Sequence, residues 1–160
     1  MLATSPSFWP HIESTLAVRR PPPDDSADEK AEPRTDADKD VAARILVVED
    51  DWFAGTDMQA TLQEAGYAVP DLVTSANEAV EAAGAGKPDL ILMDVRLAGS
   101  RDGVDAALEI RRRFGIRCLF VTAYADSALR ARAEAAYPIG WLTKPISGGA
   151  LVAAVKGALE

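Results

Sequence analysis

Short runs of apolar residues alternate along most of the chain with longer stretches in which apolar residues recur every three or four positions. The short runs lack polar alternation, which is typical of strands buried on both faces of a parallel sheet. Pro70 and Asp71 interrupt one of them, so only a weak strand is expected there. The strong runs are Ile45–Val48, Leu90–Met93 and Cys118–Val121, and the weaker ones are Ala68–Val73 and Ile139–Leu142.

The longer stretches have the spacing of amphipathic helices. In the first of them Ala54 and Met58 share one face, and Gly66 follows as a helix stop. The second is short and rich in alanine, and it is expected to close at Gly84 and Gly86. The expected helices are 52–65, 77–83, 104–114, 127–136 and 151–159.

Strand and helix alternate five times in this interpretation, and the repeat predicts an α/β fold. Parallel pairing follows because each strand is connected to the next through a helix. We therefore expect a doubly wound, five-stranded parallel sheet of the flavodoxin-like type, with helices on both faces. In sheets of this kind, ligands bind outside the carboxyl ends of the strands.

Residues 1–43 differ in composition and are expected to form a disordered N-terminal extension to a single domain at 44–160. They hold six of the ten prolines, and most residues of Asp24–Asp40 are charged or small. Such a segment buries too little apolar surface to offset the entropy lost on ordering. Two interpretations stay open: a plain unstructured extension, or one that carries a short docking motif at Phe8, Trp9 and Ile12.

Composition and charge narrow the class of protein. Apolar residues make up 48% and the net charge is −8, which favours a soluble protein and argues against direct nucleic-acid binding. The single cysteine, Cys118, cannot form an internal disulfide and suits a cytoplasmic location. Neither a membrane helix of ~20 apolar residues nor a signal peptide is recognisable, so no membrane association is expected.

Polar residues follow the predicted strands at the edge where ligands are expected. Glu49 and Asp50 follow the first strand, Asp94 the third, Thr122 the fourth and Lys144 the fifth. Crowded carboxylates repel one another unless a cation neutralises them. Three carboxylates without a cysteine or histidine favour a hard, oxygen-binding ion, so Mg²⁺ (or Mn²⁺) is the expected cofactor.

This set of side chains matches the needs of phosphoryl transfer. A carboxylate can attack phosphorus to give an acyl phosphate, while a metal ion clamps the phosphoryl oxygens. Lys144 and Thr122 would hold the remaining oxygens. Asp94 is the expected nucleophile because it directly ends the central apolar strand.

From Ile45 to Leu159 the sequence resembles a response-regulator receiver domain of the chemotaxis-regulator type. The resemblance implies two-component signalling, in which a sensor histidine kinase or a phosphotransfer protein phosphorylates Asp94. It implies no enzymatic activity beyond the protein's own aspartyl phosphorylation and dephosphorylation. Five motifs carry it, in order and at fitting spacing: Val47–Asp51, Leu92–Leu97, Asp102-Gly103, Val121–Ala123 and Leu142–Pro145.

The resemblance also implies a role for each residue of the site. Thr122 and Lys144 would respond to the phosphoryl group, and the bond from Lys144 to the following proline is expected to be cis. Trp141 falls where the family has a rotating aromatic switch, with simple core packing as the alternative. Metal binding is implied for Glu49, Asp50, Asp94 and the backbone carbonyl of Arg96.

Two segments depart from the usual family pattern. The loop Arg96–Gly103 lacks the usual proline and is one residue longer than is common. The segment Phe120–Tyr124 is similar to the Phe-Ala-Thr-Gly-Tyr subgroup, which is found with certain stress-related sensor kinases. Membership of that subgroup would alter the helix at 127–136, which has few large apolar residues.

Three other classes of protein share part of this pattern. A haloacid-dehalogenase-like phosphatase needs a second aspartate two residues after Asp94, where Arg96 stands. A flavin-binding module needs a loop that accepts phosphate after the first strand, and the acidic loop here would repel it. A binding module that signals without phosphate is the remaining rival, and the complete acidic set with Lys144 argues against it.

The expected output is contact with a downstream protein partner, as in a stand-alone response regulator, because no residues beyond Glu160 provide a DNA-binding or enzymatic domain. The surface expected to respond consists of the helices 127–136 and 151–159 and the strand between them. Through Trp141 this surface would change on phosphorylation and then bind the partner or a second copy in a homodimer.

Overall fold

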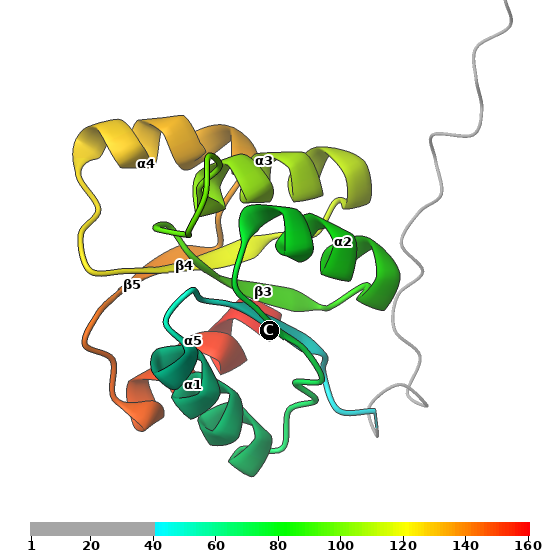
Figure 1. Ribbon diagram of the computed structural model, residues 1–160. Helices are drawn as coiled ribbons and strands as arrows, with labels where there is room; N and C mark the ends of the chain where they lie inside the picture. Colours follow the sequence, from blue (N-terminus) through cyan, green and yellow to red (C-terminus); the bar gives the residue numbers. More distant parts are fainter. Residues whose placement is uncertain (1–40) are drawn as a thin grey trace, which may run out of the picture. The chain divides into compact units, whose positions relative to one another are not determined.

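The structure is a computed structural model that describes residues 41–160. This part of the chain is built around one parallel sheet. Its strand order is β2-β1-β3-β4-β5, so the chain reverses its direction of travel across the sheet between β2 and β3. Figure 1 shows the sheet between two layers of helices. The strands are β1 (Ile45–Val48), β2 (Leu72–Val73), β3 (Leu90–Asp94), β4 (Cys118–Thr122) and β5 (Gly140–Thr143).

Helices cover both faces of the sheet, as the sequence predicts. The helices α1 and α5 lie on one face, and α2, α3 and α4 lie on the other (Figure 1). A short 3₁₀ segment, η3 (Glu134–Ala136), follows α4 directly. The helices are α1 (Trp52–Glu64), α2 (Ala76–Gly86), α3 (Gly103–Phe114), α4 (Ser127–Ala133) and α5 (Gly148–Leu159).

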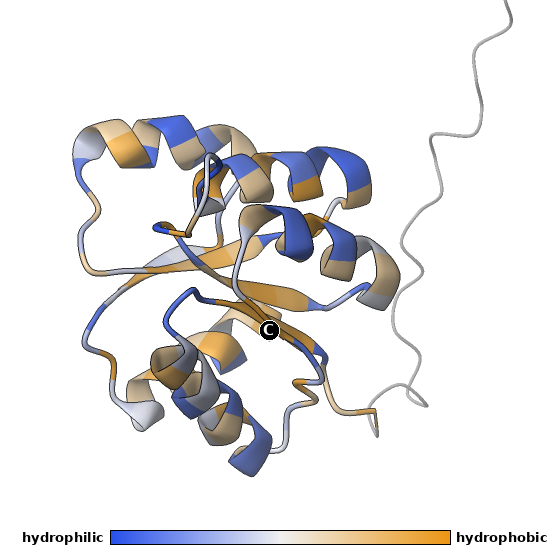
Figure 2. Cartoon of the chain, in the orientation of Figure 1, coloured by the Kyte–Doolittle hydropathy of each residue, from blue (hydrophilic) through white to orange (hydrophobic). Residues whose placement is uncertain are grey.

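Alternate residues of each central strand supply two separate hydrophobic cores. In β1, Leu46 and Val48 pack in the core beneath α2 and α3, whereas Ile45 and Val47 pack in the core beneath α1 and α5. Figure 2 shows the corresponding pattern, with apolar strands and helices whose polar residues face outward. The central strands are apolar throughout because both of their faces are covered.

Short polar side chains begin the helices by accepting backbone N–H groups. Ser75 and Glu78 form a reciprocal capping box on α2, and Asp102 and Asp105 form one on α3. Asp51 caps α1 by accepting from the amides two and three residues further on. Asp51, the third residue after β1, therefore marks the start of α1.

Several predicted elements differ from the structure in their extent; for example, α5 begins at Gly148, three residues before the predicted start at 151. The predicted strand at 68–73 is reduced to two residues, because Pro70 and Asp71 precede the only part that pairs fully with β1. The helix predicted at 77–83, closed by Gly84 and Gly86, is too short, since α2 runs from Ala76 to Gly86 and Lys87 provides the left-handed cap. The predicted helix 127–136 ends its α-helical part at Ala133 and continues as η3.

The disordered extension predicted at 1–43, with the alternative docking motif, lies outside the described residues except for its last three positions. Within the described part, Ala43 already accepts a backbone hydrogen bond from Ala68, directly before β1. No helix in residues 41–160 is long and apolar enough to cross a membrane.

Candidate functional site

Three carboxylates meet at the carboxyl edge of the sheet, beside the point where the strand order reverses. Glu49 and Asp50 follow β1, and Asp94 is the last residue of the adjacent β3. One oxygen from each carboxylate lies within 4.8 Å of the others. Glu49 and Asp94 are 1% and 6% exposed, whereas Asp50 is open to solvent. The cluster therefore has two buried members and one exposed member.

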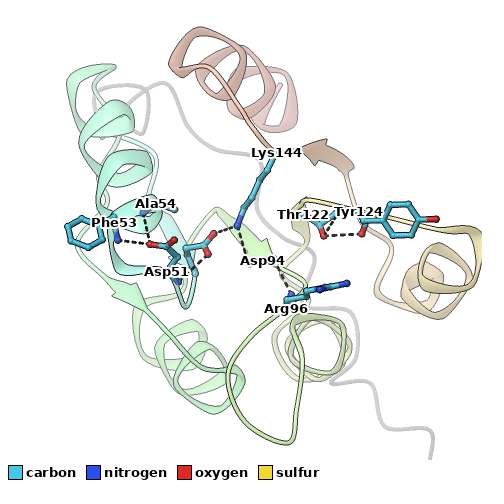
Figure 3. Close-up of polar contacts among 9 residues, drawn as sticks. Asp51, Phe53, Ala54, Asp94, Arg96, Thr122, Tyr124 and Lys144 are labelled. Atoms are coloured by element: carbon cyan, nitrogen blue, oxygen red, sulfur yellow. Dashed lines mark hydrogen bonds and ion pairs between the residues drawn. The ribbon is translucent and has the colours of Figure 1, made fainter.

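Lys144 joins this cluster from the end of β5. Its Nζ donates to Glu49 Oε2 at 2.6 Å and to Asp94 Oδ2 at 2.9 Å. Figure 3 shows the long side chain of Lys144 crossing the carboxyl edge towards Asp94. The Lys144–Pro145 peptide bond is cis, which confirms the prediction made from the family resemblance.

Burial and these contacts shift the pKa values of Glu49 and Lys144. Burial raises the pKa of Glu49; the hydrogen bond from Lys144 opposes this, and the negative charge of Asp94 reinforces it. Burial lowers the pKa of Lys144, but the hydrogen bonds to Glu49 and Asp94 and their charges outweigh it, so the pKa of Lys144 is raised. The amine is accordingly held as an ammonium ion that offsets the acidic charge.

The backbone that follows β3 positions Asp94 closely. The amide of Arg96 donates to Asp94 Oδ1 at 3.1 Å, and the amide of Gly103 donates to the carbonyl of Val95 at 2.9 Å. A Cβ atom at position 103 would lie 1.8 Å from the carbonyl oxygen of Asp94. Only glycine fits there, so the Asp102-Gly103 motif closes the loop directly against the residue that bears the carboxylate.

Thr122 ends β4 on the other side of Asp94, and the residue is 2% exposed. Its hydroxyl donates to the carbonyl oxygen of Tyr124 at 3.1 Å and accepts from the amide of Tyr124 at 3.4 Å. Figure 3 shows this pair separated from the Lys144 contacts across the strand ends. The hydroxyl is therefore engaged with its own loop in this conformation.

Trp141 lies on β5 next to Phe120 of β4 and is partly buried. Their rings stack with centroids 4.6 Å apart and planes inclined by 23°. The guanidinium of Arg130, on α4, covers the Trp141 ring with its Cζ 4.8 Å from the centroid. The ring is thus held between an aromatic residue and a cation, whichever of its two predicted roles applies.

The donor set of the cluster fits a divalent cation. Three carboxylate oxygens at this spacing, with no nitrogen or sulfur ligand among them, are what a hard cation such as Mg²⁺ binds. Arg96 lies two residues beyond Asp94, and the use of its backbone carbonyl as a further ligand stays a prediction. Glu49, Asp50 and Asp94 are the residues that would hold the ion.

Two features at and near the site could not be predicted from the sequence. The close approach of Gly103 to the Asp94 carbonyl has a signal in the sequence, the Asp-Gly pair, but the spacing alone does not say what the glycine contacts. The second feature is an ion pair between Asp102 and Arg132, which joins α3 to α4 across thirty residues. No local pattern in the sequence signals that pair.

Comparisons with known proteins agree on one family. The model of the response regulator receiver domain matches residues 45–156. PdtaR of Mycobacterium tuberculosis, a transcriptional regulatory protein, is 38% identical over 128 residues, which cover 80% of this chain and 62% of PdtaR. The phyllosphere-induced regulator PhyR of Methylorubrum extorquens is 32% identical over 115 residues, 71% of this chain and 43% of PhyR. The chain thus spans less than two thirds of the length of these relatives.

Solved structures show the same fold. The signal receiver domain of a modulated diguanylate cyclase from Desulfovibrio desulfuricans G20 superposes with a TM-score of 0.69 at 29% identity, covering 74% of this chain and 94% of that one. The chemotaxis protein CheY4 of Vibrio cholerae superposes with a TM-score of 0.68 at 25% identity, covering 74% of this chain and 100% of that one.

Proposed function

This chain belongs to the response regulator receiver domain family, and on that premise we propose that it is phosphorylated on Asp94. The observation that carries the proposal is the position of Asp94 at the end of β3, with Oδ2 on the Lys144 amine and Oδ1 on the amide of Arg96. Both contacts orient the carboxylate, and the ammonium reduces the repulsion that an incoming phosphoryl group meets.

The reaction is the transfer of one phosphoryl group. A carboxylate oxygen of Asp94 attacks phosphorus, and the bond from phosphorus to the donor breaks, which is P–N for a phosphohistidine and P–O for acetyl phosphate. The leaving group keeps the electron pair of that bond. In a separate deactivation step, water attacks the phosphorus of the acyl phosphate, which restores the Asp94 carboxylate and releases inorganic phosphate.

The acidic cluster is suited to Mg²⁺, or Mn²⁺, held by Glu49, Asp50 and Asp94. When bound, the ion supplies positive charge to the phosphoryl oxygens as the transfer proceeds. Lys144 already neutralises part of the acidic charge through Glu49 and Asp94. The Thr122 hydroxyl lies at the end of the neighbouring strand. Once its bond to the Tyr124 carbonyl is released, it can donate a hydrogen bond to a phosphoryl oxygen.

The protein acts as a phosphoacceptor and not as an enzyme towards another substrate. Its partners in this role are a sensor histidine kinase or a phosphotransfer protein, as donor, and a downstream protein bound through the surface of α4, β5 and α5. A second copy of the chain can occupy the same surface in a homodimer. Trp141 connects that surface to Thr122, because it stacks on Phe120 two residues earlier in β4.

Incubation with acetyl phosphate and Mg²⁺, followed by intact mass spectrometry, tests the proposal. Wild-type protein should gain a single phosphoryl group, and Asp94→Asn should gain none, because an amide does not attack phosphorus. Asp50→Asn keeps the nucleophile and should label more slowly. Light scattering on the labelled and unlabelled samples then reads the association state. Equal labelling of wild type and Asp94→Asn would refute the assignment of Asp94.

A further inference from the structure

An ion pair ties α4 to the loop that follows Asp94. The Arg132 guanidinium, on α4, binds Asp102 Oδ2, and its Nη2 lies 3.9 Å from Asp105 Oδ1. Asp102 uses its other oxygen, Oδ1, to accept the amide of Asp105 at 3.0 Å and cap α3. One aspartate therefore begins α3 and anchors α4 at the same time.

The anchor is adjacent to the phosphoacceptor. Gly103, the next residue after Asp102, lies against the carbonyl oxygen of Asp94, where a Cβ atom would come within 1.8 Å. Its amide donates to the carbonyl of Val95 at 2.9 Å. Contacts therefore run without a break from the backbone at Asp94 through Gly103 and Asp102 to Arg132.

A second arginine fixes α4 on its other side. Arg130 covers the Trp141 ring and donates from Nε to the carbonyl of Ala125 at 3.4 Å. Ala125 belongs to the short loop between Thr122 and α4, and the Thr122 hydroxyl is bonded within that loop to Tyr124. The Thr122 hydroxyl holds this loop through two bonds to the Tyr124 backbone, so a hydroxyl that turns away releases the segment to which α4 is attached and allows it to move.

We propose that the Asp102–Arg132 ion pair is a latch that opposes this movement. The proposal rests on the proposed phosphorylation of Asp94. To bond a phosphoryl oxygen, the Thr122 hydroxyl must leave Tyr124, which frees the loop before α4 to move. Arg132 opposes that movement by holding α4 to Asp102. The latch therefore stabilises the conformation in which Thr122 is bonded to Tyr124. Arg132 and Asp102 are positioning residues that act through α4, and neither takes part in the chemistry.

Thermodynamic reciprocity gives the latch a measurable sign. A contact that favours the conformation in which Thr122 is bonded to Tyr124 weakens the binding of any ligand that requires the other conformation. The affinity falls by the same factor by which the contact shifts the equilibrium between the two conformations. Removing the ion pair should therefore tighten the binding of a phosphoryl analogue. Partly exposed ion pairs have modest strength, so the expected gain in affinity is about two- to fivefold.

The experiment titrates beryllofluoride, in the presence of Mg²⁺, into the full chain and follows tryptophan fluorescence. Arg132→Gln and Asp102→Asn should each lower the apparent dissociation constant about two- to fivefold. Asparagine is also a good helix cap, so Asp102→Asn removes the charge and keeps the start of α3. The double variant should bind no more tightly than either single variant, because both remove the same contact.

Arg112→Gln is the matched control, since it removes an exposed arginine near the other end of α3 and should leave the affinity unchanged. Hydrogen exchange in the α4 peptide should be faster in Arg132→Gln before any analogue is added. Unchanged affinity in both single variants, or additive effects in the double variant, would overturn the latch. Acetyl phosphate labelling of the wild type is measured in parallel, to separate the two proposals. If the affinities contradict the latch but the wild type is labelled, only the latch is refuted. If the wild type is not labelled either, the proposed phosphorylation of Asp94 is refuted as well.

Discussion

Gly103 packs so closely against the Asp94 carbonyl that no larger residue fits without a shift of the backbone. An alanine there would place its Cβ 1.8 Å from the Asp94 carbonyl oxygen, and backbone must move to accept it. Gly103→Ala should therefore lower the free energy of unfolding by about 1–3 kcal/mol, the usual range for overpacking a well-packed site. Because the displaced backbone carries Asp94, labelling by acetyl phosphate should also slow. Urea denaturation and labelling kinetics measure the two effects.

Gly157→Ala provides the control for this substitution. Gly157 lies in α5, and a Cβ there meets no other atom within 4 Å. Alanine is the better helix former, so Gly157→Ala should leave labelling unchanged and stabilise the protein by up to about 1 kcal/mol. If Gly103→Ala were as stable and as reactive as wild type, the close approach to the Asp94 carbonyl would not constrain the site.

At the scale of single elements, the start of α2 should make stability depend on pH. The pKa of Glu78 is lowered, first by the hydrogen bond from the backbone amide of Thr74 and further by Ser75. A carboxylate with a lowered pKa adds stability that is fully present above its unfolded pKa and is lost as pH falls through its folded pKa. The contribution of Glu78 should therefore be present at pH 7, begin to fall near the ordinary glutamate pKa of about 4.3, and disappear below the lowered folded pKa.

Glu78→Gln isolates this effect. At pH 7 the variant should be less stable than wild type by less than about 1 kcal/mol, because the side chain is exposed and its charge is screened. The difference between the two proteins should shrink as the pH is lowered from 6 to 3. Thermal unfolding at a series of pH values measures it, and a difference that is constant across the series would show that the charge of Glu78 is not involved.

The elements that could be predicted from the sequence are those whose local signals agree with their burial. The runs that became β1, β3 and β4 are apolar because both faces are covered, so pattern and structure coincide. Gly84 shows where such signals conflict. A glycine normally stops a helix, but here it gives α2 room against Phe114, whose ring would lie 2.8 Å from an added Cβ. That role depends on α3 and is invisible locally.

The carboxylate cluster could be predicted for a similar reason. Parallel strands end at one edge, so the residues at or just after the ends of β1, β3 and β5 had to come together, and Lys144 does reach Glu49 and Asp94. The partner of Thr122 could not be predicted, because a hydroxyl can turn towards its own loop or towards a neighbouring strand. The Asp102–Arg132 pair also depends on how α4 packs, which its few large apolar residues do not specify.

At the scale of the whole molecule, Mg²⁺ should stabilise the fold, because the cluster of Glu49, Asp50 and Asp94 exists only when β1 and β3 are paired. An ion that binds the folded chain alone adds about 1.4 kcal/mol at ten times its dissociation constant, and this shows as a rise in melting temperature that EDTA reverses. Asp50→Asn, at the exposed member of the cluster, should reduce the rise. The opposing possibility is simple screening, since the chain carries a net charge of −8. Glu64→Gln separates the two: it makes the same charge change at the far end of α1, and its response to Mg²⁺ should equal that of wild type at matched ionic strength. Equal responses from Asp50→Asn and Glu64→Gln would mean that Mg²⁺ acts on the net charge and not at the carboxyl edge of the sheet.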